Sequence, residues 1–193
     1  MPTATKDDRR GARERLLEAA SRLFYAEGVH TVGVDRIIEE AGVAKASLYK
    51  TFGSKDALVQ AYLTGRHERT TGRIVAALAL VDDPREKILT LYDVQATMFV
   101  EPGYRGCAFV AAASESAPGD TAEEAAAVYR GWMRALFVDL AEQVGASEPR
   151  VLGRQLHLLW DGASLSARME RDWSVAADAR AAAAALVAAA QAR

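Results

Sequence analysis

The residues whose types and spacing best suit chemistry lie in the segment 41–55. Lys45, Lys50 and Lys55 occur there with no carboxylate among them, although the whole chain of 193 residues has a formal net charge of −2. The local electrostatic potential governs contact with a polyanion, so this acid-free run matters more than the net charge of the whole chain. Lysines beside a serine and a tyrosine can donate hydrogen bonds to phosphates and base edges, so the segment predicts contact with nucleic acid.

The same segment has the pattern of a short helix with two different faces. Leu48 and Phe52 are four residues apart, so they share one face and can be buried together. Lys45 and Tyr49, also four apart, share another face. Gly42 precedes the helix and permits the positive φ that a sharp turn needs. We therefore predict an apolar back that packs on a partner helix and a polar front that suits a groove of DNA.

Two earlier segments have the periodicity needed to hold that helix. Apolar residues recur at helical spacing over Asp7–Glu27, and Gly28 stands where a helix commonly ends. A second helix is predicted over Val34–Ala41, with Gly33 at its N-cap. Together with the lysine-bearing segment, the second helix has the length and turn of a helix-turn-helix unit.

The remainder of the chain is predicted to be helical throughout. Ser54 is placed to cap a long helix, and the polar middle of that helix, Thr64–Thr71, is a point where it could bend. Cys107–Ser116 is interpreted as a buried helix, although its length also allows a strand. Further helices are predicted over 84–100, 121–144, 150–171 and 173–193. The predicted fold class is all-α with about nine helices, divided into a three-helix domain over 1–53 and a helical domain over 54–193.

Composition excludes several classes of protein. Half of the residues are hydrophobic and 26% are charged, as in a soluble globular protein, and no run of about 18 uncharged apolar residues is available to span a membrane. Met1–Gly11 is polar and lacks the apolar region of a secretory signal. Arg9 and Arg10 form either a small basic arm or a frayed terminus. The single cysteine, Cys107, fits a reducing compartment, so we expect a cytoplasmic location.

Gly28–Leu58 and the end of the preceding helix resemble the N-terminal DNA-binding domain of the TetR family of transcriptional repressors. The matching residues are Phe24-x-x-x-Gly28, Ala41-Gly42-Val43 and Lys45-x-Ser47-Leu48-Tyr49-x-x-Phe52-x-Ser54-Lys55-x-x-Leu58. Two later stretches also look like members of this family, namely Arg105-Gly106-Cys107 and Leu159-Trp160-Asp161-Gly162-Ala163. The resemblance implies an all-helical homodimer that binds a palindromic site in double-stranded DNA.

By this resemblance the short helix is the recognition helix and faces the operator. The DNA-binding residues that the resemblance implies are Lys45, Ala46, Ser47, Tyr49, Lys50 and Lys55, with Arg36 and residues 31–33 as candidates for backbone contact from the second helix. Lys55 and Tyr49 are expected to bind phosphates, Lys55 beside the backbone N–H groups that open the fourth helix.

The sequence departs from the family pattern at four positions. Ala44 and Ala46 stand where the family often has Ser and Gly, and Lys50 and Thr51 stand where it often has His and an aromatic residue. The missing cap at Ala44 is expected to cost the recognition helix about 1 kcal/mol. The changes at Lys50 and Thr51 are expected to alter which operator is read, not whether DNA is bound.

The helical remainder contains large or soft side chains that either line an effector pocket or form ordinary core. They are Tyr92, Met98, Tyr104, Cys107, Phe109, Trp132, Met133, His157 and Trp160. Cys107 is interpreted as a buried, inert thiol, with a redox sensor as the alternative. The last two helices are the expected dimer surface, with Leu156, Gly162, Ala163 and Leu186 as candidate contacts.

The function implied by the resemblance is that of a homodimeric repressor released from its operator by a small molecule. An activator, or a regulator without a small-molecule effector, is the alternative. An enzyme is the least supported class, because the sequence offers no nucleophile–base arrangement and no phosphate-cradling glycine loop. We expect no cofactor and no metal, since His30, His67 and His157 are far apart in sequence and have no cysteine partners at ligand spacing.

Overall fold

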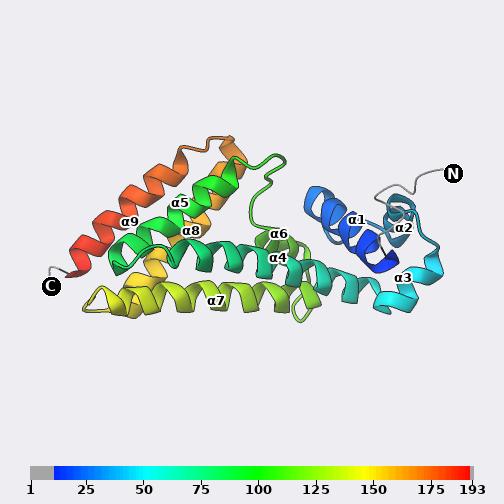
Figure 1. Cartoon of the computed structure of the whole chain (residues 1–193), viewed down its shortest axis with the longest axis horizontal. Coiled ribbons are helices and arrows are strands. Elements are labelled where there is room, and N and C mark those ends of the chain that lie inside the picture. Colours follow the sequence, from blue (N-terminus) through cyan, green and yellow to red (C-terminus); the bar gives the residue numbers. More distant parts are fainter. Residues whose placement is uncertain (1–10, 192–193) are drawn as a thin grey trace. The chain divides into compact units, whose positions relative to one another are not determined.

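The computed structural model describes residues 11–191, which form an all-helical fold (Figure 1). Over this range the chain contains nine α-helices and no strand, which confirms the predicted fold class. They are α1 (Ala12–Glu27), α2 (Val34–Ala41), α3 (Lys45–Phe52), α4 (Lys55–Leu78), α5 (Pro84–Phe99), α6 (Ala108–Glu115), α7 (Thr121–Gln143), α8 (Pro149–Glu170) and α9 (Val175–Gln191). Among the described residues no helix is both long enough and apolar enough to cross a bilayer.

The chain divides into two compact units. The first comprises the described residues up to Arg66 together with Ala108–Ala126, and the second comprises His67–Cys107 and the chain from Ala127 onward. Helices α4 and α7 therefore contribute residues to both units. The boundary predicted at residues 53–54 falls just before α4, whereas the first compact unit continues to Arg66 and also takes in α6.

Helix α1 supplies much of the core of the first unit. Its buried residues recur at helical spacing, namely Leu16, Ala19, Ala20, Leu23 and Phe24. Among the described residues the helix begins at Ala12, with Gly11 as its N-cap. The predicted start at Asp7, and Arg9 and Arg10, lie outside the described residues. At the other end Gly28 adopts φ 98° and its N–H donates to the carbonyl of Phe24, as expected for a helix terminator.

The α2–α3 connection has the predicted geometry. Helix α2 has the bounds predicted for it, and Gly42 follows in the left-handed region at φ 61°. The N–H of Gly42 donates to the carbonyl of Glu39, and the N–H of Val43 donates to the carbonyl of Ile38. These two bonds satisfy the last carbonyls of α2 within a very short turn, which brings α3 back against the first two helices.

Helix α4 is continuous over 24 residues. Ser54 caps it as predicted, because its Oγ accepts a hydrogen bond from the N–H of Ala57 at 3.0 Å. Gly65 and the polar residues after it lie within the helix and do not interrupt it. In the first unit α4 packs on α1, where the ring centroids of Phe24 and Tyr62 are 5.6 Å apart.

The second unit is built from helices packed around an apolar core. Helix α5 starts at Pro84, and the Asp83 side chain before it accepts a hydrogen bond from the N–H of Glu86 at 2.9 Å. Helices α8 and α9 lie side by side and both contact α5 (Figure 1). A Cβ at Gly153 would lie 2.9 Å from backbone atoms of Val138, so this glycine allows the close approach of α8 to α7.

The segment after Cys107 is a helix. Helix α6 spans Ala108–Glu115, so the strand that its length also allowed is excluded. Its buried residues are Ala108, Phe109 and Ala112. Helix α6 and the first turn of α7 belong to the same compact unit as the N-terminal helices.

Candidate nucleic-acid interface

Helix α3 has the buried back and exposed front that its sequence predicts. Leu48 has no exposed surface, and Phe52 is half-buried with the guanidinium carbon of Arg13 5.5 Å from its ring centroid. On the other face Tyr49 is 47% exposed, and Lys50 is exposed as well. Burial of the back fixes the helix on α1 and leaves the front available to a partner.

Lys45 is held by a carboxylate of the preceding helix. Its Nζ donates to Oδ1 of Asp35 at 2.8 Å, and both side chains are exposed. The hydrogen bond and the charge of Asp35 raise the pKa of Lys45, so the lysine is fully cationic at neutral pH. The sequence prediction did not include Asp35, whose spacing of ten residues from Lys45 becomes a contact only through the α2–α3 turn.

Lys50 differs from the other two lysines of this segment. Within the part of the chain that the structure describes, its ammonium has no hydrogen-bond or ion-pair partner. It lies in the last turn of α3 and is exposed. An exposed amine with no partner among the described residues can reach a base edge or a phosphate without first breaking an interaction with them.

The remaining predicted DNA-binding residues differ in their exposure and in whether they form an ion pair. Ala46 is exposed and Ser47 is half-buried on α3. Arg36 is exposed on α2, but its guanidinium donates to Oε1 of Glu27 at 2.9 Å. This ion pair joins α2 to the end of α1, so a DNA contact by Arg36 would compete with it.

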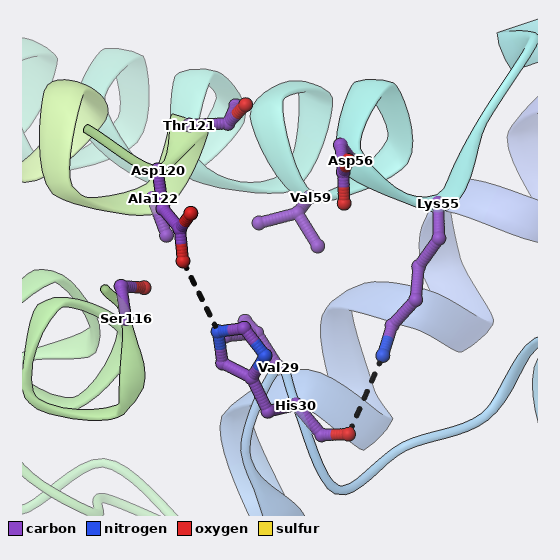
Figure 2. Close-up of a pocket in the computed structure, with 9 residues that line it drawn as sticks. All are labelled: Val29, His30, Lys55, Asp56, Val59, Ser116, Asp120, Thr121 and Ala122. Atoms are coloured by element: carbon purple, nitrogen blue, oxygen red, sulfur yellow. Dashed lines mark hydrogen bonds and ion pairs between the residues drawn. The ribbon is translucent and has the colours of Figure 1, made fainter. Parts of the chain in front are cut away.

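Lys55 lies beside a small polar cavity within the first unit. The cavity has a volume of about 80 Å³ and is lined by Val29, His30, Lys55, Asp56, Val59, Ser116, Asp120, Thr121 and Ala122. Figure 2 shows the Lys55 side chain directed at the backbone carbonyl of His30, 3.5 Å from its Nζ. The imidazole of His30 points toward the Asp120 carboxylate at 4.0 Å.

Next to this cavity lies a contact that the sequence prediction did not include. His30 and Glu115 are 85 positions apart, yet the N–H of His30 donates to Oε2 of Glu115 at 3.1 Å. Neither the periodicity nor the spacing of residues in the sequence predicts such a contact. The only local sign is Gly28, which marks a turn without saying what packs against it.

Three of the candidate ligand-binding residues form an aromatic cluster in the second unit. The ring centroids of Tyr92 and Trp160 are 6.3 Å apart, and Phe137 lies 6.1 Å from His157. The hydroxyl of Tyr92 donates to the carbonyl of Leu156 at 2.8 Å. Burial lowers the pKa of His157, while the nearby Asp161 charge opposes that shift. Its Nε2 is buried without a hydrogen-bond partner.

The other candidate ligand-binding residues do not all join this cluster. Trp132 faces the ring of His67 at 6.2 Å, and Met98 and Cys107 are half-buried. Phe109 belongs to the first unit and is buried there. The sequence prediction did not include Gln95, whose side-chain amide is buried. Its Nε2 donates to the carbonyl of Trp160 and to Oγ of Ser164, and its Oε1 is buried without a partner.

The candidate dimer contacts divide between the core and the surface. Leu156 has no exposed surface and Ala163 is buried, so both serve the core of their own chain and are unavailable to a partner as placed. Leu186 is half-buried and Gly162 is exposed. The exposed face of α8 instead carries large apolar side chains that the sequence prediction missed. They are Val151, Leu158, Leu165 and Met169.

The arrangement of α1–α3 defines a helix-turn-helix DNA-binding unit, and comparison with known proteins gives its family. Residues 16–62 match the family of bacterial regulatory proteins, tetR family. A solved TetR-family transcriptional regulator from Streptomyces coelicolor superposes with a TM-score of 0.89 and 32% identity, covering 93% of this chain and 96% of that one. The chain belongs to the TetR family of transcriptional regulators.

Curated relatives match over part of the chain. An uncharacterized HTH-type transcriptional regulator of Mycobacterium tuberculosis is 36% identical over 78 residues, which cover 40% of this chain and 39% of the relative. The HTH-type transcriptional activator FasR of Mycolicibacterium smegmatis is 37% identical over 83 residues, covering 43% of this chain and 36% of the relative. The match therefore spans about two fifths of the length of these curated relatives.

Proposed function

We propose that this regulator is a homodimeric repressor that releases a palindromic operator when a small molecule binds its second unit. The observation that carries the DNA-binding step is the exposed front of α3, with Tyr49 and the unpaired Lys50 above a fully buried Leu48. Such a helix can enter a major groove without losing its packing.

The exposed face of α8 supports the dimer. Val151, Leu158 and Leu165 are spaced by seven residues, and the first and last of these are 48% and 54% exposed. A seven-residue apolar repeat is the seam by which helices pair, so a second copy of α8 is its natural partner. In such a dimer the two copies of α3 would read half-sites about 34–36 Å apart.

Buried polar atoms in the second unit support an effector site. Nε2 of His157 and Oε1 of Gln95 are buried without a hydrogen-bond partner among the described residues, although Oδ1 of Asp161 lies 3.8 Å from that Nε2. A buried polar atom without a hydrogen bond is costly unless something supplies one. An aromatic effector with a polar group would match the rings around His157. Since α4 contributes residues to both units, a shift of its second half is carried along one continuous helix toward α3. The effector must bind the two states with different affinities.

An activator is the second candidate, and the similarity to FasR favours keeping it. That relative is named a transcriptional activator, and it is 37% identical to this chain over 83 residues. In vitro transcription from a promoter carrying the selected site distinguishes the two, because a repressor lowers transcript yield and an activator raises it.

Selection of bound sites from random DNA tests the proposed function. We expect a palindromic motif, and log affinity should fall linearly with log salt by about 0.9 for each phosphate contact. Lys55→Ala should weaken binding to every sequence and flatten that slope by about one. Binding that does not respond to salt, or an unchanged slope in the variant, would count against the assignment.

A further inference from the structure

Glu115, the last residue of α6, binds the turn between α1 and α2. Oε2 of Glu115 accepts the hydrogen bond from the N–H of His30 at 3.1 Å. Gly28 has φ 98°, and a Cβ placed there would lie 2.4 Å from Oε1 of the same carboxylate. The carboxylate of Glu115 therefore occupies the space that a side chain at position 28 would take. The glycine provides both the backbone conformation and the room for this contact.

Three contacts hold His30 in this region, and Figure 2 shows those of its imidazole and its carbonyl. Its N–H binds Glu115, its imidazole faces Asp120 at 4.0 Å, and its carbonyl lies 3.5 Å from Nζ of Lys55. Glu115 and Asp120 flank the α6–α7 connection, while Lys55 opens α4. The backbone of one residue thus links the end of α6 to a lysine that is expected to bind a DNA phosphate.

This link has a consequence for the recognition helix. The turn that Glu115 holds leads within four residues of His30 into α2, which the α2–α3 turn joins to α3. When His30 N–H loses its carboxylate partner, the turn gains freedom and Lys55 loses the fixed carbonyl that orients it. Ordering these groups again on DNA costs conformational entropy, which lowers affinity.

We propose that Glu115 is a positioning residue for DNA binding, which acts on the DNA through the α1–α2 turn and Lys55. The inference rests on the proposed function, because it requires Lys55 to contact DNA.

The test compares three variants for binding to the selected operator. Glu115→Ala removes the acceptor, Glu115→Gln keeps an acceptor and removes the charge, and Glu124→Ala removes an exposed carboxylate from the start of α7 as the matched control. Removal of a negative charge alone would tighten binding to DNA. If Glu115 positions the turn, Glu115→Ala should instead weaken binding to DNA. We expect its Kd to rise about tenfold, equivalent to about 1.4 kcal/mol. Glu115→Gln should stay within about twofold of the wild type, and Glu124→Ala should not weaken binding.

A double-mutant cycle separates positioning from general destabilisation. Because Glu115 acts through Lys55, the effect of Glu115→Ala should shrink in a Lys55→Ala background. Hydrogen exchange of the His30 amide should accelerate in Glu115→Ala, while exchange of the α1 core amides stays unchanged.

The possible outcomes distinguish this inference from the proposed function. A wild type that binds no DNA would overturn both. A wild type that binds DNA overturns the role of Glu115 alone if Glu115→Ala binds as tightly as Glu124→Ala, or if Glu115→Gln is as defective as Glu115→Ala. Additive effects of Glu115→Ala and Lys55→Ala, or an unchanged His30 exchange rate, would overturn it equally.

Discussion

At the scale of single residues, the three lysines around α3 have different degrees of freedom. Lys45 is bound to Asp35, and Lys55 is directed at the His30 carbonyl, so each is positioned by the protein. Lys50 has no partner within the described residues and is exposed. A fixed amine suits a phosphate at a constant place along the backbone, whereas a free one can adapt to base edges.

Exchanging Lys50 should therefore change operator preference. Lys50→Ala removes an amine that competes with no internal contact, and loss of one base contact should relax discrimination at one position by about 1–3 kcal/mol. Site selection from random DNA with the wild type and the variant measures this. The same motif from both proteins would show that Lys50 reads no base.

His157 makes the stability of the protein sensitive to acid. Burial lowers its pKa in the folded state, against the opposing charge of Asp161, whereas in the unfolded chain the pKa is about 6.5. As the pH falls below about 6.5 the unfolded chain takes up the proton more readily than the folded one, so stability falls. His157→Phe, which keeps a ring beside Phe137, should show a smaller loss of Tm between pH 7.5 and pH 5.5. An equal loss in both proteins would exclude this histidine as the source.

At the scale of elements, local signals in the sequence located the helix-turn-helix well. The bounds of α2, the left-handed Gly42 and the Ser54 cap follow from side-chain type and spacing over a few residues, and the structure confirms them. The start of α1 is harder to place from the sequence, because a polar N-terminus has no apolar periodicity to mark it. The contact between Glu115 and His30 could not be predicted, because it joins elements 85 residues apart through a backbone N–H.

The start of α3 has room for a better cap. Ala44 has the extended backbone of an N-cap, at φ −71° and ψ 148°, but no side-chain acceptor. Ala44→Ser should supply a hydroxyl to the free N–H groups of the first turn and raise the free energy of unfolding by about 1 kcal/mol. Urea denaturation measures the change. Ala135→Ser, at an exposed position inside α7, is the control and should give no gain, since serine favours caps over helix interiors. No gain at position 44 would show that the extended backbone there does not present the hydroxyl to the helix.

At the scale of the whole molecule, helix α8 exposes a row of large apolar side chains to solvent. Leu158 and Met169 are 62% and 74% exposed, whereas the opposite face of α8 is buried in the core of its unit. Of the dimer contacts that the sequence prediction placed on this helix, Leu156 and Ala163 face inward and Gly162 is exposed. Periodicity alone showed an apolar helix and could not say which of its two apolar stripes the chain's own core would take.

Placing a charge on that stripe should separate the protomers. Leu158→Glu puts a carboxylate in the middle of the expected seam, where burial without a partner is unfavourable. Light scattering should then show the mass of one chain, and affinity for the palindromic operator should fall at least about a hundredfold, because only one half-site binds at a time. Val75→Glu is the matched control, since Val75 is 58% exposed on α4 in the same unit and should leave both mass and affinity unchanged. If Leu158→Glu stays dimeric, the two copies meet through another surface, and the distance between their recognition helices is set elsewhere.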